Sequence, residues 1–186
     1  MKKFLLLLFF ACLLPLTQVF AQDKFFTKTG RVAFFSSTPM ENIEAKNTNA
    51  TSVLDTKAGK MEIAVLMKAF KFEKALMEEH FNENYVESAK FPKAVFAGSI
   101  TNLAAVDFTK NGNYKVTVKG KLTMHGVTKE IEVPGTINVQ NGAVKADAMF
   151  NVAPEDYKIE IPKLVRDKIA RQIKITVAFD YQALKS

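Results

Sequence analysis

The sequence contains little of the chemistry on which most enzymes and metalloproteins depend. Its 186 residues include one cysteine, Cys12, two histidines, His80 and His125, and no tryptophan. We find no zinc-type spacing of ligands, no Gly-x-Ser-x-Gly motif and no glycine-rich phosphate loop. A single cysteine also excludes an internal disulfide, so stability must come from packing and from backbone pairing. We therefore expect no catalytic residues, no metal and no cofactor.

The remaining polar candidates do not change that expectation. Glu78-Glu79 and Glu155-Asp156 are adjacent carboxylates, and neighbours on a helix do not face each other. His80 falls on a helical apolar stripe, where a packed and hydrogen-bonded histidine is expected. His125 precedes a glycine in a turn, where we expect a structural role, with contact to a ligand as the alternative.

The chain is basic, with a formal net charge of +7. Its lysines mostly alternate with apolar residues, which is typical of the solvated face of a strand. There is no arginine-rich run and no basic helix, so we expect no binding to nucleic acid.

The N-terminus has the layout of a secretory signal peptide. Lys2 and Lys3 precede the apolar run Phe4–Leu14, Pro15 ends that run, and Val19-Phe20-Ala21 provides a cleavage site before Gln22. We expect residues 1–21 to be removed and residues 22–186 to form one domain in the periplasm or outside the cell. The net charge would then be about +5.

Two alternatives remain for this segment. It could anchor the protein in a membrane, although the stretch of residues 4–20 is short and interrupted for a spanning helix. It could also belong to a lipoprotein that is lipidated at Cys12, although the residues before this cysteine form a poor lipobox.

Apolar and polar residues alternate over most of the remaining chain, which predicts about eight antiparallel strands. In residues 114–124 the even positions are apolar, and in 173–181 the odd positions are. Similar runs cover 61–67, 131–139 and 144–152, and weaker ones cover 30–36, 41–54 and 94–106. Asn111-Gly112, His125-Gly126 and Asn141-Gly142 supply hairpin turns. The apolar faces must be buried by closure into a barrel or by stacking of sheets.

Helical spacing interrupts this pattern at Phe72–Tyr85, where Phe72, Leu76, Met77 and Phe81 form one stripe. We expect a helix that covers one end of the strands, with its glutamates in water. A second short helix is expected over 163–172, and Pro134-Gly135 is expected to kink or bulge its strand.

Three motifs resemble the YceI-like family. The first is the stretch Leu76–Gly98, in which a helix precedes the aromatic-proline pair Phe91-Pro92 and a strand that carries phenylalanine. The second is Gly-Lys-Leu-Thr-Met-His-Gly-Val-Thr-Lys at 120–129, which is similar to the family's histidine-glycine hairpin. The third is Phe150, followed by Asp156-Tyr157 and the closing alternating strand.

The resemblance covers nearly all of residues 24–184 and implies a lipocalin-like antiparallel β-barrel around a lipophilic cavity. It also implies export and an isoprenoid-type lipid, such as a quinone, as partner. A polyprenyl phosphate is a second candidate for that lipid, and transient membrane contact is an expectation of our own. One departure is clear: many members begin with Asp-x-x-His-Ser, whereas residues 27–35 here contain no histidine.

The leading hypothesis is therefore a carrier or buffer of one long apolar lipid, and not an enzyme. The alternative is an exported interaction module whose barrel is filled with side chains. Predicted lining residues are Phe34, Met61, Ile63, Val65, Phe72, Leu76, Met77, Phe81, Phe96, Val116, Val118, Leu122, Ile175, Val177 and Phe179. Predicted headgroup contacts are His125, Lys158, Lys163, Arg166 and Lys168.

Overall fold

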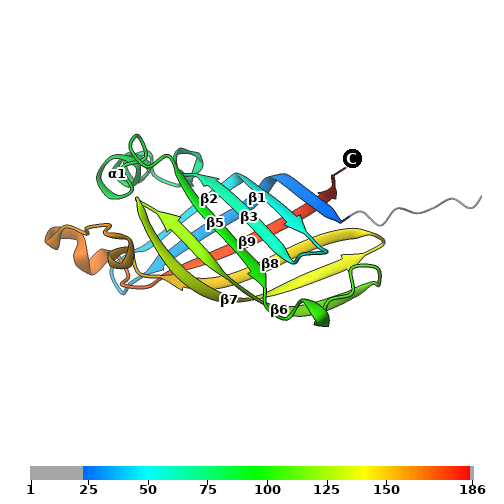
Figure 1. Ribbon diagram of the computed structural model, residues 1–186. Helices are drawn as coiled ribbons and strands as arrows, with labels where there is room; N and C mark the ends of the chain where they lie inside the picture. The colour runs from blue at the N-terminus through cyan, green and yellow to red at the C-terminus, as the bar shows by residue number, and fades with distance from the viewer. Residues whose placement is uncertain (1–22, 185–186) are drawn as a thin grey trace, which may run out of the picture.

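The computed structural model describes residues 23–184, and the predicted leader with Cys12 lies outside this range. Within these residues, nine antiparallel strands form one sheet (Figure 1). Their bounds are β1 Lys24–Ser37, β2 Asn42–Asp55, β3 Lys60–Leu66, β4 Lys71–Phe72, β5 Lys93–Ile100, β6 Gly112–Met124, β7 Val127–Gln140, β8 Ala143–Val152 and β9 Ile173–Ala183.

The sheet closes on itself. Its order is β1-β9-β8-β7-β6-β5-β3-β2, and β2 pairs again with β1, so eight strands complete a barrel. The short β4 adds to β2 outside the ring, at Ala45 and Lys46. Closure removes the free edges that an open sheet would present to other chains. The predicted antiparallel β-barrel is confirmed.

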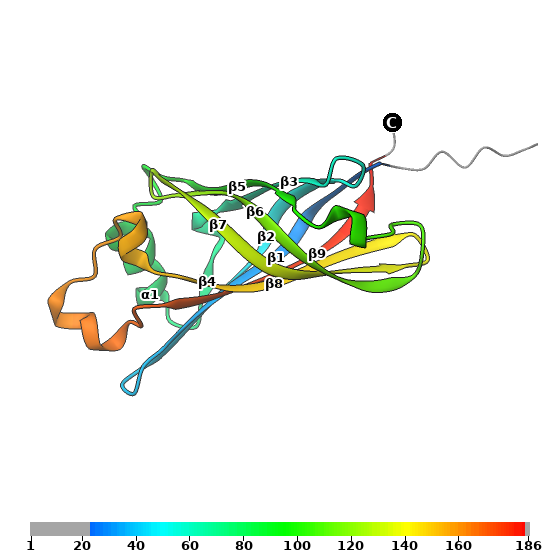
Figure 2. The same cartoon turned by 60° about the horizontal axis from the view of Figure 1, so that its bottom comes forward.

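The two ends of the barrel carry different connections. At one end, which we call the α1 end, lie the turn 38–41, the segment 67–92, the turn 125–126 and the segment 153–172. At the other, the far end, lie the turn 56–59, the segment 101–111 and the turn 141–142, together with the start of β1 and the end of β9. Figure 2 shows the loop of residues 153–172 and the β1–β2 hairpin projecting at the α1 end, where α1 also lies.

Short helices occupy these connections. At the α1 end are η1 Met67–Ala69, α1 Ala75–His80, the π-helical turn η2 Phe81–Tyr85, η4 Pro154–Tyr157 and η5 Lys163–Lys168, and the far end carries η3 Leu103–Ala105. None of the helices within residues 23–184 has the length and apolar character needed to cross a membrane.

The predicted helix over residues 72–85 is shorter than its apolar stripe suggested. Phe72 belongs to β4, and the α-helix begins only at Ala75. Glu78 was expected to face water, but its carboxylate accepts a hydrogen bond from Lys71 Nζ at 2.6 Å. That contact ties α1 back to β4, and it lowers the pKa of Glu78.

Two of the three predicted hairpin turns are confirmed. His125-Gly126 and Asn141-Gly142 both have positive φ at both positions, as a two-residue turn of type I′ requires. Asn111-Gly112 is instead the end of a longer connection that contains η3, because β5 stops at Ile100 rather than continuing to Val106. The expected second helix over 163–172 is limited to η5.

The predicted kink at Pro134-Gly135 has a different form. The pairing of β6 with β7 runs through Thr117↔Pro134 and Val116↔Gly135 without any shift in register. The ladder between β7 and β8 ends at this point, since β7 pairs with β8 only from Gly135 onward. Proline has no N–H to donate, so the ladder cannot continue through Pro134.

The far half of the barrel is filled with side chains. Leu54 and Ala50 are fully buried there, and Val144 is 1% exposed. The Tyr181 hydroxyl lies 2.7 Å from Ser52 Oγ across the interior. Gly30 leaves room for the ring of Phe179, because a Cβ on Gly30 would lie 2.4 Å from Phe179 Cδ1.

Candidate ligand-binding cavity

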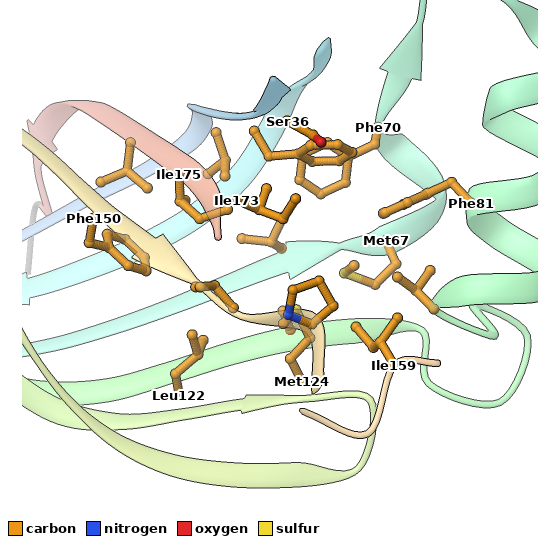
Figure 3. Close-up of a pocket in the computed structure, with 18 of the residues that line it drawn as sticks. Ser36, Met67, Phe70, Phe81, Leu122, Met124, Phe150, Ile159, Ile173 and Ile175 are labelled. Atoms are coloured by element: carbon orange, nitrogen blue, oxygen red, sulfur yellow. The ribbon is translucent and has the colours of Figure 1, made fainter. Parts of the chain in front are cut away.

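The half of the barrel toward the α1 end is hollow. A cavity of about 530 Å³ lies between the strands there, lined mainly by aliphatic and aromatic side chains. Figure 3 shows how side chains from opposite walls, including Leu122, Phe150 and Ile175, point into the same space. A volume of this order suits a single small-molecule ligand. The interaction-module hypothesis required a barrel filled throughout with side chains, and this barrel is not filled throughout.

The structure brings together all fifteen predicted lining residues. They come from β1, β3, β4, α1, η2, β5, β6 and β9, and every one borders the cavity: Phe34, Met61, Ile63, Val65, Phe72, Leu76, Met77, Phe81, Phe96, Val116, Val118, Leu122, Ile175, Val177 and Phe179. Alternation in a strand sends every second side chain inward. That these residues contact a ligand stays a prediction.

Other lining residues were missed by the sequence reasoning. Met67, Met124, Phe150 and Ile173 line the cavity from the inward side of alternating runs, so the same pattern could have identified them. Ile159, Ile161, Val165 and Ile169 line it from the irregular segment 153–172. That segment has no strand periodicity, and only its contact with the barrel reveals their role.

An aromatic cluster forms one wall of the cavity at the α1 end. Phe34 of β1 packs against Phe70, Phe72 and Phe81, with ring centroids 5.4 to 5.6 Å apart. Phe72 and Phe81 are themselves 5.1 Å apart. Such tilted and edge-on pairs each add about 1 kcal/mol beyond the area they bury. The cluster therefore holds β4 and η2 against β1 of the barrel, and its rings present apolar faces to the cavity.

Polar side chains reach the cavity mainly at the α1 end. Glu41 comes from the β1–β2 turn, Lys74, His80 and Tyr85 from the α1 segment, and Lys168 from η5. Lys74 Nζ lies 3.7 Å from Glu41 Oε1. Burial raises the pKa of the Tyr85 hydroxyl, so this group stays a neutral donor at physiological pH.

Of the five predicted headgroup residues, Lys168 lines the cavity and the others do not. Lys163 is exposed on η5, and Arg166 Nη2 lies 3.6 Å from Glu155 Oε2. Lys158 takes a left-handed backbone conformation at the end of η4. Their nearness in sequence does not become a cluster at the cavity, because Lys158 ends η4 whereas Lys163 and Arg166 lie at exposed positions of η5.

His125 has a structural position rather than one at the cavity. Its side chain is 11% exposed, with Nε2 2.8 Å from Glu87 Oε2 and Nδ1 3.0 Å from the carbonyl oxygen of Tyr157. A carbonyl oxygen only accepts, so in that contact the Nδ1–H donates to the Tyr157 carbonyl. The Phe91 ring packs edge-on at 4.6 Å. We call His125, Glu87 and the Tyr157 carbonyl the histidine latch, which joins three connections of the α1 end. His80, in contrast, is exposed on α1.

The barrel wall is open in one place at the α1 end. Residues 127–134 of β7 pair only with β6, and residues 149–152 of β8 pair only with β9. Figure 2 shows β7 turning away from β8 there. The gap is covered by the segment 153–172, since η4 lies against β7 and Ile159 lines the cavity. The interior is thus separated from solvent there by a connection rather than by a strand ladder.

Within residues 23–184, no group of three or more histidine, cysteine, aspartate or glutamate side chains could hold a metal ion.

Comparison with known proteins identifies the fold and the family. The YceI-like domain model matches residues 23–181. A polyisoprenoid binding domain from Saccharophagus degradans, implicated in plant cell wall breakdown, is 15% identical and superposes with a TM-score of 0.77 over 88% of this chain and 100% of that one. No curated protein matches the sequence.

Two further solved structures share the fold. BcnA of Burkholderia cenocepacia is 15% identical, with a TM-score of 0.65 over 80% of this chain and 94% of that one. The YCEI protein of Campylobacter jejuni is also 15% identical, with a TM-score of 0.59 over 76% of this chain and 85% of that one.

Proposed function

The chain belongs to the YceI-like family, and on that premise we propose that it carries or buffers one long apolar lipid of isoprenoid type inside its barrel. The observation that carries the proposal is the cavity of about 530 Å³ with its apolar walls. Burial of apolar surface contributes about 25 cal/mol per Å². A hydrocarbon tail could therefore bind there without a polar anchor.

The orientation of the lipid follows from the two halves of the barrel. The far half is filled, so a tail would extend from the α1 end toward Phe179. A headgroup would then lie near Glu41, His80, Tyr85 and Lys168. His80, Tyr85 and Lys168 offer donors for a quinone carbonyl or a phosphate, while the Glu41 carboxylate is paired with Lys74. These groups replace His125, Lys158, Lys163 and Arg166 as the headgroup contacts in the proposal.

The experiment is extraction of the protein purified from its own host without detergent. Mass spectrometry of the extract identifies the tail, and ultraviolet absorption distinguishes a quinone from a polyprenyl phosphate. We expect wild type to carry lipid. Val118→Trp fills the cavity from an inward position, whereas Lys119→Trp places the same ring on the outer face. Only Val118→Trp should lose the lipid.

Circular dichroism of both variants shows whether the barrel is intact. An empty wild-type protein, or a folded Val118→Trp variant with its full complement of lipid, would contradict the carrier proposal.

We also propose that the protein is exported and not an enzyme, and that its mature form begins at Gln22. Support for export and for this mature N-terminus comes from the order of charged, apolar and small residues in the first 21 positions. The mass of the protein recovered from the periplasm or the medium tests export and the position of the mature N-terminus. A lipidated form that begins at Cys12, or an intact leader, would contradict it.

A further inference from the structure

The three most exposed large apolar side chains of residues 23–184 all lie at the α1 end. Leu164 is 94% exposed, Met40 65% and Leu76 61%. They come from η5, the β1–β2 turn and α1, which are three separate connections of the α1 end. Single exposed apolar residues are ordinary on a protein surface, but Leu164 is almost completely exposed on a segment whose neighbouring residues line the cavity.

The segment around Leu164 has two apolar faces. Its neighbour Val165 and the following Ile169 line the cavity, while Leu164 points into solvent. Leu76 combines both roles, because it lines the cavity and is also largely exposed. Figure 2 shows η5, in orange, as the outermost part of this end. Apolar surface therefore continues from the outside of the molecule into the cavity.

The charges around Leu164 are mostly positive. Within η5, Lys163, Arg166 and Lys168 flank it and Asp167 is the single acid, while Arg166 is also paired with Glu155 of η4. The α1 side of the same end has mixed charge, because Glu73, Glu79 and Glu83 are exposed there beside Lys68, Lys71 and Lys74. A basic segment with a projecting leucine suits an anionic lipid surface, which attracts the cations and accepts the apolar side chain.

We propose that the tip of η5, with Leu164 and its flanking cations, docks the α1 end onto the surface of an anionic lipid bilayer. This docking depends on the exposed surface of the protein and not on a bound lipid. If the proposed function is correct, docking places the cavity where a lipid could pass between bilayer and barrel. One leucine with Lys163, Lys168 and the Glu155-paired Arg166 gives weak, reversible attachment. Such attachment suits a protein that must leave the membrane again.

The absence of tryptophan from the sequence makes a direct test possible. Leu164→Trp introduces a single fluorophore at the tip, and Met149→Trp places one on the outer wall of β8, where Met149 is 55% exposed. Vesicles of phosphatidylglycerol with phosphatidylcholine should shift the emission of Leu164→Trp to shorter wavelength and leave Met149→Trp unchanged. A shift in both variants, or in neither, would overturn the proposal.

Sedimentation with the same vesicles measures affinity. Leu164→Ser should weaken binding about tenfold, the effect expected when one leucine side chain no longer leaves water. Met149→Ser should bind as wild type does. If wild type does not sediment with the vesicles, or if Leu164→Ser binds equally well, η5 is not the docking element.

A charge-reversal pair separates local recognition from general attraction. Lys163→Glu with Arg166→Glu should abolish the preference for phosphatidylglycerol over phosphatidylcholine alone. Lys57→Glu with Lys60→Glu makes the same change in net charge at the far end, where both lysines are exposed, and should retain the preference. Equal losses in the two pairs would overturn the role of η5.

Lipid extraction from the same preparations keeps the two proposals apart. Protein that carries lipid but ignores vesicles contradicts docking alone. Protein that binds vesicles through Leu164 but yields no lipid supports docking and contradicts the carrier function.

Discussion

The two halves of this barrel are built from the same strands and the same alternation of side chains, yet one is filled and the other is hollow. In the far half, Phe179 packs over Gly30 and Tyr181 reaches across to Ser52. In the α1 half, inward residues such as Val118 and Ile175 cover the walls without meeting in the centre. What differs between the halves is the distance between the walls: β7 and β8 are paired only from Gly135 and Ala148 toward the far end, so the barrel is wider in the α1 half.

The largest expected difference in stability between the two halves concerns two leucines. Leu54 is fully buried in the filled half, whereas Leu122 borders the cavity. Leu54→Ala should lower the free energy of unfolding by about 3 kcal/mol, because it creates a new void. Leu122→Ala should cost no more than about 1.5 kcal/mol in the lipid-free protein, because its side chain already adjoins empty space.

Urea denaturation with an unchanged m-value measures both effects. Equal losses would mean that the two halves are packed alike.

A second prediction concerns the response of the filled half to alkaline pH. Burial raises the pKa of Tyr181 to about 12, and the hydrogen bond with Ser52 lowers it less. Between about pH 10 and pH 12 the unfolded chain loses this proton first, so the unfolded state binds fewer protons than the folded one and stability falls as pH rises. The loss should be on the order of 2 kcal/mol in total, and it should be absent below about pH 9, where the unfolded chain also keeps the proton.

Denaturation at a series of pH values, with Tyr181→Phe as control, provides the measurement. The variant should show a clearly shallower decline, and a decline as steep as that of wild type would assign the effect to other groups.

A third prediction compares the two histidines, both at the hollow end. His125→Asn tolerates the positive φ of the turn but removes the contact with Glu87, so it should destabilise by about 1.5 kcal/mol. His80→Asn, on the exposed surface of α1, should change stability by less than about 0.5 kcal/mol. Thermal or urea unfolding distinguishes them. If His80→Asn costs as much as His125→Asn, the histidine latch does not hold this end together.

The smallest expected effect is a change in hydrogen exchange. When lipid is added to the emptied protein, amides of residues 75–85 should exchange severalfold more slowly, because the helical cover gains apolar contacts. Amides around Val144 and Tyr181 in the filled half should not change. Slowing that is equal in the two halves would indicate general stabilisation rather than closure over the cavity.

The strands and their inward faces could be predicted from sequence because period two is local. Val118 inward and Lys119 outward follow from neighbouring residues alone, and the structure places them so. The strand ends were less predictable. The pattern did not indicate that β5 stops at Ile100, since the Thr101 and Asn102 side chains there bond to β6, a contact distant in sequence.

The polar part of the site was harder to predict for a similar reason. Lys158, Lys163 and Arg166 are close in sequence, but their directions depend on how the segment 153–172 crosses the gap between β7 and β8. His125 drew attention as a rare residue in a turn, and its partners Glu87 and Tyr157 come from two other connections. No pattern of sequence spacing predicts a contact among residues on three separate connections.

Closure of the ring through β1 and β9 also determines how the molecule must fold. Phe34 pairs with Ile175, so the first strand of the barrel finds one of its two neighbours only in the last. Contacts between residues so distant along the chain are slow to form, because a very long loop must be ordered first. Until β9 arrives, β1 and β8 remain unpaired edges and the apolar interior is open to other chains. Folding should therefore be slow and most vulnerable to aggregation just before the final strand joins.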